Sequence, residues 1–482
     1  MLDHDHLQRH RSPARESFAR TCAARAEPAA RQGLDRHVDG VPVQGASREN
    51  GQHQHLCVVA AHTPSSVHSQ HSTRRVVRDT YYADMRRWLR TLLVLTLAVV
   101  LAVGGYLAYV ATRSAQPITL PAPTGRYPVG RTMVDWTDSA RTDPLAPHPG
   151  PPRRLSAWLW YPATRTPDPA PTAYAPGAWA GLHLPGPLGL AETDFAAVHV
   201  HAVAEAPVAE GTFPTVVFEP GLGFAALQYT TLAESLASNG YLVIGVTPTY
   251  SANLTVLNGQ PVSTTEAGNP DAFNGDDEHA SQAQAAGDRL IDVWAADARF
   301  AASQAGAGRF AGHVDTTKIV YFGHSFGGAA ALEACRTDQH CVGAVDLDGT
   351  QYGSVVHTGL TKPALLIGSE NSCITGTCQP VNADDQSSLS TARTLVAATS
   401  GPTWCYQLNG AEHFNFSDYG AYYIAAPVRS QLALGAIDGD DALSITNAYL
   451  AAFVTQVTSG HPEPLLAGRA TPYSPVVVQH TP

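Results

Sequence analysis

The stretch Lys318-Ile-Val-Tyr-Phe-Gly-His-Ser-Phe-Gly-Gly-Ala-Ala-Ala-Leu-Glu-Ala334 places an apolar run before a glycine-flanked serine and an alanine-rich run after it. This order predicts a strand, a tight turn and a helix. In the G-x-S-x-G nucleophile elbow, the glycines relieve crowding at a strained turn, and the serine hydroxyl is exposed at a helix N-terminus. Ser325 is therefore the candidate nucleophile. An ordinary strand-to-helix turn is the alternative.

Strands alternate with helices on both sides of this stretch. Strands are predicted at 215–219, 241–246, 343–347, 363–367 and 403–408, the last of the sheet, and helices at 227–238, 280–303, 387–398 and 441–457. Aromatic and branched runs at 127–136 and 155–161 predict an antiparallel entry to the sheet. This alternation predicts an α/β protein with a mostly parallel central sheet and helices on both faces, and together with the elbow motif it is typical of the α/β-hydrolase fold.

Two further polar residues follow predicted strands. Asp348 comes directly after the strand at 343–347, and His413 follows the strand at 403–408 across a short turn. Reactive groups in an open α/β sheet gather outside the carboxyl ends of the strands. Ser, Asp and His in this order match the triad of α/β-hydrolases. We therefore expect Ser325 to attack, His413 to act as general base and then acid, and Asp348 to orient His413.

These assignments leave alternatives. Asp346 competes with Asp348, but alternation along the strand turns Asp346 away from the surroundings of Asp348 or into the sheet. Glu370, which follows the strand at 363–367, is the more serious competitor. His413 has its own alternative, which is a histidine on a surface loop.

A tetrahedral intermediate also requires two hydrogen-bond donors that face its oxyanion. The residue after the nucleophile, Phe326, supplies one backbone N–H. The turn Gly221-Leu222-Gly223 follows an early strand and offers the second, which we assign to Leu222. A plain glycine turn is the alternative at this position.

The N-terminal part of the chain differs from the rest. Residues 1–84 are rich in Arg and His without apolar periodicity, and this predicts a disordered tail or an untranslated extension. Residues 85–113 place three arginines before, and only Arg113 after, an uncharged apolar run long enough to cross a bilayer. The positive-inside rule places the following domain outside the cytoplasm. A cleaved signal peptide, which would release the protein, is the alternative. Residues 114–124 are expected to form a linker, 125–460 the catalytic domain and 461–482 a C-terminal tail.

Composition limits the partners. The chain carries a net charge of −11, which does not favour nucleic acid. The spacing predicts the disulfides Cys335–Cys341 and Cys373–Cys378 with Cys405 left over, although Cys405 could equally pair within the second set. These spacings do not match zinc fingers, and the acidic run at 276–279 is explained more simply as a helix cap than as a metal site. We expect no metal and no cofactor.

The motifs together resemble the platelet-activating-factor acetylhydrolase family, a serine-dependent, calcium-independent branch of the α/β-hydrolases. The matching segments are Gly323-His-Ser-Phe-Gly-Gly328, Leu-Leu-Ile-Gly-Ser-Glu370, Glu412-His-Phe-Asn-Phe-Ser-Asp418 and Pro220-Gly-Leu-Gly-Phe224, together with Asp348. The resemblance covers about 125–420. It implies Ser325, Asp348 and His413 as the triad and Leu222 and Phe326 as backbone donors.

Two departures limit this transfer. Pro220 stands where related enzymes often have a histidine before the oxyanion glycine. The chain is also similar to cutinase-like polyester hydrolases, whose acid follows a later strand. Ser372 occupies that position here, and the absence of an acid there strengthens the assignment of Asp348 as the triad acid.

The sequence thus predicts a membrane-anchored, extracytoplasmic serine esterase that acts on short-chain or lipid-like acyl esters. A peptidase or an acyltransferase on the same triad is the alternative within enzymes. A non-catalytic binding domain is the alternative outside them. The oligomeric state is not predicted.

Overall fold

The computed structural model describes residues 70–482 except 168, 185, 275–279, 430 and 469. The acidic run at 276–279 and the tail at 1–69 therefore lie outside the described residues. The described chain separates into two compact units, 70–109 and 110–482, and each is treated by itself.

A single long helix, α2 (Gln70–Ser114), occupies the N-terminal part of the described chain. It begins ahead of the expected start at Met85, so the expectation of disorder up to residue 84 is wrong for 70–84. Within α2, the segment Thr80–Ser114 is long and apolar enough to cross a membrane by its length and composition. Many of its apolar side chains, among them Trp88, Leu93 and Leu101, are more than half exposed.

The larger unit is built on a ten-stranded sheet with the order β14-β13-β12-β11-β10-β6-β7-β3-β2-β5. Six neighbouring strands are parallel, namely β13 (Thr403–Leu408), β12 (Ala364–Ser369), β11 (Cys341–Leu347), β10 (Val314–His324), β6 (Phe213–Glu219) and β7 (Leu242–Thr247). β3 (Pro152–Pro162) and β2 (Val129–Thr142) continue the sheet as the expected antiparallel pair, and β5 (Val203–Ala204) pairs parallel to β2. The mostly parallel sheet is thus confirmed.

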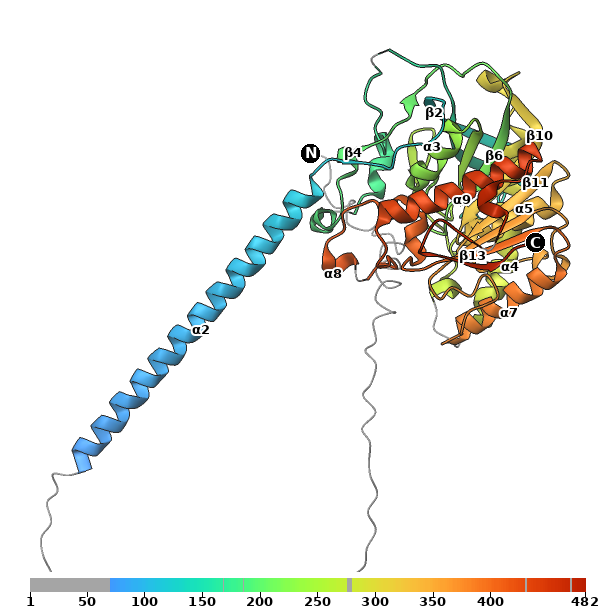
Figure 1. Ribbon diagram of the computed structural model, residues 1–482. Helices are drawn as coiled ribbons and strands as arrows, with labels where there is room; N and C mark the ends of the chain where they lie inside the picture. The colour runs from blue at the N-terminus through green and yellow to red at the C-terminus, as the bar shows by residue number, and fades with distance from the viewer. Residues whose placement is uncertain (1–69, 168, 185, 275–279, 430, 469) are drawn as a thin grey trace, which may run out of the picture. The chain divides into compact units, whose positions relative to one another are not determined.

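Helices cover both faces of the sheet, because its central strands are apolar on both sides and need cover there. α3 (Thr230–Ser238) and α9 (Gly439–Ser459) contribute to one apolar cluster, through Leu232 and Phe453 among others. α4 (Ala280–Ser303), α5 (Phe326–Thr337) and α7 (Ala383–Ala398) contribute to another, which contains Leu332 and Leu395. Figure 1 shows α9 crossing the sheet beside α3, with α7 farther toward the other side.

Smaller elements connect these layers. They comprise the strands β1 (Ile118–Thr119), β4 (Val198–His199), β8 (Thr255–Leu257) and β9 (Gln260–Val262), the short helices α6 (Val355–Thr358) and α8 (Ala426–Arg429), and several 3₁₀ turns. The described part of the segment 162–211, which lacks 168 and 185, contains three such turns and places the buried Trp179 against Trp158.

Two segments expected outside the catalytic domain belong to this unit. β14 (Val476–His480) pairs antiparallel with β13, so the expectation of a C-terminal tail at 461–482 is wrong, as is that of β13 as the last strand. β1, which lies in the expected linker, pairs with β4, and Leu120, the residue after β1, is 1% exposed. Both short strands gain their backbone hydrogen bonds from strands that are distant in sequence, which local patterns do not reveal.

The cysteines pair as the closest spacing predicts. Disulfides join Cys335 to Cys341 and Cys373 to Cys378. Cys405 is a free thiol, and burial raises its pKa to about 12. The alternative in which Cys405 takes a partner from the second pair is therefore wrong.

Candidate active site

Ser325 lies at the turn between β10 and α5 with φ 57° and ψ −127°. Residues other than glycine rarely adopt this backbone conformation, and such strained residues cluster at functional sites. The turn needs its glycines: a Cβ on Gly323 would lie 2.2 Å from the backbone of Gly327, and one on Gly327 would lie 2.1 Å from the Glu219 carbonyl oxygen. The sequence therefore folds into the tight elbow that the motif predicts, with Ser325 half-buried at its apex.

Asp348 and His413 come together at the same edge of the sheet. Asp348 directly follows β11, and His413 begins a 3₁₀ turn after β13. His413 Nδ1 lies 2.7 Å from Asp348 Oδ2. The carboxylate is 4% exposed, whereas the imidazole is 31% exposed. Because Asp348 occupies Nδ1, His413 keeps Nε2 for proton exchange.

Asp348 is held in its charged form. Burial alone would raise the pKa of this carboxyl, but the hydrogen bond and charge of His413 lower it below its ordinary value. The Ser369 N–H, 2.8 Å from Asp348 Oδ1, and the Ser372 hydroxyl act in the same direction. A carboxylate that is both buried and ionised is suited to orient an imidazole and to stabilise its positive charge.

The two competing acids lie elsewhere. Asp346 accepts hydrogen bonds from the Gly349 N–H at 2.9 Å and from Gln351 Nε2 at 3.0 Å, and burial raises its pKa well above its ordinary value. Glu370 is exposed and accepts a hydrogen bond from the Gly410 N–H at 2.6 Å. The bond between His413 and a carboxylate is therefore made by Asp348.

The loop after β6 lies directly against the elbow. A Cβ on Gly221 would lie 3.3 Å from Ser325 Cβ and 3.2 Å from His324 Nδ1. The Leu222 N–H in this loop makes no backbone hydrogen bond to a described residue. Phe326 is the first residue of α5, so its N–H has no partner within the helix. The Leu222 and Phe326 N–H groups therefore stay the predicted oxyanion donors.

Sequence reasoning missed Tyr229 and His324. Tyr229 Oη lies 3.0 Å from the Gly221 nitrogen and 2.7 Å from His324 Nδ1. His324 Nε2 lies 2.8 Å from the His413 carbonyl oxygen. The only signal in the sequence was the identity of the residue before the serine, and its partners are distant along the chain.

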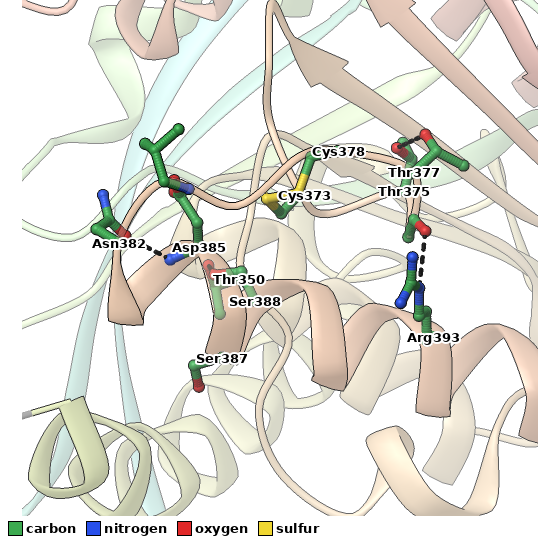
Figure 2. Close-up of a disulfide and its surroundings, with 12 residues drawn as sticks. Thr350, Cys373, Thr375, Thr377, Cys378, Asn382, Asp385, Ser387, Ser388 and Arg393 are labelled. Atoms are coloured by element: carbon green, nitrogen blue, oxygen red, sulfur yellow. Dashed lines mark hydrogen bonds between the residues drawn. A yellow bond between two sulfur atoms is a disulfide. The ribbon is translucent and has the colours of Figure 1, made fainter.

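The disulfide Cys373–Cys378 closes the loop that follows β12 and carries Ser372. Figure 2 shows this loop lying along α7, where Arg393 Nε donates to the Gly376 carbonyl oxygen at 3.1 Å. The Thr350 and Ser388 hydroxyls, 2.7 Å apart, join α7 to the segment after Asp348. The surroundings of Asp348 are thus fixed from two directions.

Apolar rings gather around Phe326, the residue that follows Ser325. Phe326 packs against Trp294 and Tyr352, with ring centroids 4.9 Å and 5.4 Å away, and Phe273 lies beside both Phe326 and Tyr352.

The part of the chain that the structure describes contains no group of three or more His, Cys, Asp or Glu side chains placed to hold a metal ion.

Comparison with known proteins gives concordant matches. The model of the family "Platelet-activating factor acetylhydrolase, isoform II" matches residues 290–463. A probable 1-alkyl-2-acetylglycerophosphocholine esterase of Arthroderma benhamiae is 26% identical over 76% of this chain and 95% of its own length. The platelet-activating factor acetylhydrolase of Cavia porcellus is 24% identical over 70% of this chain and 77% of its own length.

A solved structure is also similar. The ferulic acid esterase from Streptomyces cinnamoneus superposes with a TM-score of 0.62 at 27% identity, over 75% of this chain and 99% of that protein. These matches confirm the family resemblance expected from the sequence, and they show that the chain is a hydrolase.

Proposed function

The chain is a hydrolase that resembles the platelet-activating-factor acetylhydrolase family, and from this premise we propose that it is a serine carboxylic-ester hydrolase of the α/β-hydrolase fold. The observation that carries the proposal is the 2.7 Å bond between His413 Nδ1 and Asp348 Oδ2. The strained turn at Ser325 lies next to this pair, because the Ser325 N–H donates at 2.8 Å to the carbonyl oxygen of Leu347, the residue before Asp348. The names of the relatives support an ester substrate, because both the esterase of Arthroderma benhamiae and the ferulic acid esterase cleave esters.

The first half-reaction forms an acyl-enzyme. His413 Nε2 takes the proton of the Ser325 hydroxyl as the serine oxygen attacks the ester carbonyl carbon. The carbonyl oxygen becomes an oxyanion that accepts hydrogen bonds from the Leu222 and Phe326 N–H groups. Asp348 stabilises the imidazolium that results. When the intermediate collapses, His413 returns the proton to the leaving alcohol, and the acyl group stays on Ser325.

The second half-reaction restores the serine. A water molecule gives a proton to His413 Nε2 and attacks the acyl carbon, which again places charge in the oxyanion site. Collapse releases the carboxylic acid, and His413 returns the proton to Ser325. The chain therefore needs no metal and no cofactor for this cycle.

We also propose that α2 anchors the protein in a membrane, with the catalytic domain outside the cytoplasm. The apolar segment within Thr80–Ser114 and the arginines before it support this topology. The pairing of β1 with β4 and of β14 with β13 supports a catalytic domain that extends from about 118 to 480, beyond the limits of 125 and 460 expected from the sequence. Short-chain or lipid-like acyl esters are the proposed substrates.

The Ser325→Ala variant tests this function. We expect the parent to hydrolyse p-nitrophenyl esters, with a rate that depends on acyl length, and the variant to lose about 10⁵-fold or more in kcat. Hydrolysis that is unchanged in the variant would exclude Ser325 as the nucleophile. A parent that cleaves no ester but binds one would favour a binding domain, and cleavage of peptides in preference to esters would favour a peptidase.

A further inference from the structure

Three hydrogen bonds link the loop after β6 to the backbone of His413. They run from the Gly221 N–H to Tyr229 Oη, from Tyr229 Oη to His324 Nδ1, and from His324 Nε2 to the His413 carbonyl oxygen, at 3.0, 2.7 and 2.8 Å. Gly221 precedes one proposed oxyanion donor, Leu222, and His413 is the proposed base. The chain of bonds therefore connects two functional loops that are far apart in sequence.

The direction of each bond follows from chemistry. A carbonyl oxygen only accepts, so His324 Nε2 carries a proton and donates to His413. A neutral imidazole has one N–H, which leaves His324 Nδ1 as an acceptor. The Tyr229 hydroxyl must then donate to His324 Nδ1, while its oxygen accepts the Gly221 N–H. Each of the three bonds thus has one donor and one acceptor, and the arrangement specifies one tautomer of His324.

The same groups are removed from water. Tyr229 and His324 are each 1% exposed, so solvent does not replace a lost partner. The titratable groups that face His324 are Tyr229, His413 and Asp348. Burial, followed by the charge of His413, lowers the pKa of His324 well below its ordinary value. His324 is therefore neutral at physiological pH, which agrees with the assigned tautomer.

We propose that Tyr229 and His324 are positioning residues that hold the oxyanion loop and the His413 loop at a fixed separation across the nucleophile. This inference rests on the proposed serine-esterase function. Catalysis depends on the distance between the base, the serine oxygen and the oxyanion donors, and small displacements of these groups are costly. A neutral His324 also places no positive charge beside the imidazolium that forms on His413, whose ring centroid is 4.5 Å away.

Tyr229→Phe removes the central hydroxyl and keeps the ring. We expect kcat for a p-nitrophenyl ester to fall about tenfold, the effect of roughly one lost hydrogen bond, while KM stays within twofold. Affinity for a trifluoromethyl ketone, which forms a tetrahedral adduct with an active-site serine, falls by the same factor. Rates are divided by the site concentration from organophosphate titration, so that loss of folded protein does not contribute.

Tyr161→Phe is the matched control. Tyr161 is also fully buried, and its hydroxyl donates to the Ala206 carbonyl oxygen at 2.7 Å, away from the elbow. We expect this variant to lose stability without a change in kcat for each titrated site. The proposal is overturned if Tyr229→Phe keeps kcat within twofold, or if its loss disappears after correction for titrated sites or appears as a rise in KM.

Substitutions of His324 test the second half of this chain of three hydrogen bonds, which we call the relay and to which we assign no proton transfer. His324→Gln keeps an N–H donor at about the position of Nε2, whereas His324→Met removes it. We expect the Gln variant to retain about tenfold more kcat than the Met variant, and Tyr229→Phe to cause no further loss when added to His324→Met. Equal activities of the Gln and Met variants, or full additivity, overturn the relay. If Ser325→Ala is inactive but these results fail, only the relay is wrong. If Ser325→Ala is active, the proposed function itself is wrong.

Discussion

Asp348 illustrates how one residue is selected from three candidates by its surroundings. It directly follows β11 and carries a positive φ of 56°, which turns its side chain toward His413. Asp346, two residues earlier, accepts hydrogen bonds from Gly349 and Gln351 in the turn that follows β11. Glu370 is exposed and bonded to the Gly410 N–H. The contacts thus support the acid that strand alternation favoured in the sequence.

A comparison of Asp348→Asn with Glu370→Gln tests this assignment. We expect Asp348→Asn to lower kcat about 10⁴-fold, because the amide favours the wrong tautomer of His413 and does not stabilise its charge. Glu370→Gln keeps an oxygen acceptor for Gly410 and should change kcat by less than threefold. Steady-state kinetics on one p-nitrophenyl ester measures both. A crippled Glu370→Gln beside an active Asp348→Asn would assign the acid to Glu370.

At the residue scale, the sequence predicted polar groups that follow strands and did not predict contacts between side chains that are distant along the chain. The contact between Asp348 and His413 was predictable because both residues follow strands, and the carboxyl ends of parallel strands share one edge of a sheet. Tyr229 and His324 were not, because their partners lie about a hundred residues apart. Only folding brings these side chains together.

Two disulfide-closed loops allow a controlled test at the scale of elements. Cys335–Cys341 and Cys373–Cys378 span 6 and 5 positions. In the loop-closure view, each stabilises the fold by about 2 kcal/mol. Cys335 lies in the last part of α5, away from the elbow, whereas the second loop follows Ser372, which bonds Asp348.

We therefore expect the two double Cys→Ala variants to lose similar unfolding free energy in urea. Only the variant at 373 and 378 should lose kcat, by about fivefold to tenfold, because the hydrogen bond from Ser372 to Asp348 is loosened. Activity for each titrated site separates this effect from instability. If both variants keep full kcat, or both lose it equally, the loop does not position Asp348.

Glu234 of α3 gives the stability of the fold a pH dependence. Its carboxylate accepts the Ala202 N–H at 2.7 Å, and burial raises its pKa to about 7. The unfolded value is about 4.3, so the folded chain binds the extra proton between these limits. This contribution to stability is therefore present at low pH and is lost as pH rises through 7.

Glu234→Gln should remove this dependence. We expect the unfolding free energy of the variant minus that of the parent to rise by on the order of 2 kcal/mol from pH 5 to pH 8. Urea titrations of the full chain in detergent, followed by tryptophan fluorescence, measure the difference. Glu210→Gln, at an exposed carboxylate, is the control. A Glu234→Gln difference that is equal at both pH values would mean that Glu234 is ionised throughout.

Elements with strong local patterns were predicted well, and those that depend on distant pairing were not. The parallel strands and α4 follow from apolar runs and helical periodicity. The sequence does not predict β14, because its short valine run gains stability only against β13. α2 was expected to begin at Met85 because the apolar run starts there, whereas the helix continues back to Gln70.

At the scale of the whole molecule, membrane attachment is the feature to measure. We expect the full chain to sediment with membranes and to resist alkaline carbonate, because an uncharged helix of about 20 residues is held by the hydrocarbon core. A chain that begins after residue 114 should be found in the soluble fraction. Recovery of the native protein from the medium with an N-terminus after α2 would instead indicate a cleaved signal peptide.

The central claim is that Ser325 is the nucleophile of an ester hydrolase. A fluorophosphonate probe applied to the intact protein, followed by peptide mass spectrometry, tests it most directly. We predict one adduct, on Ser325, and a loss of ester hydrolysis in proportion to its formation. Hydrolysis that persists after Ser325 is fully labelled, or that disappears with an adduct on another residue, would contradict the account.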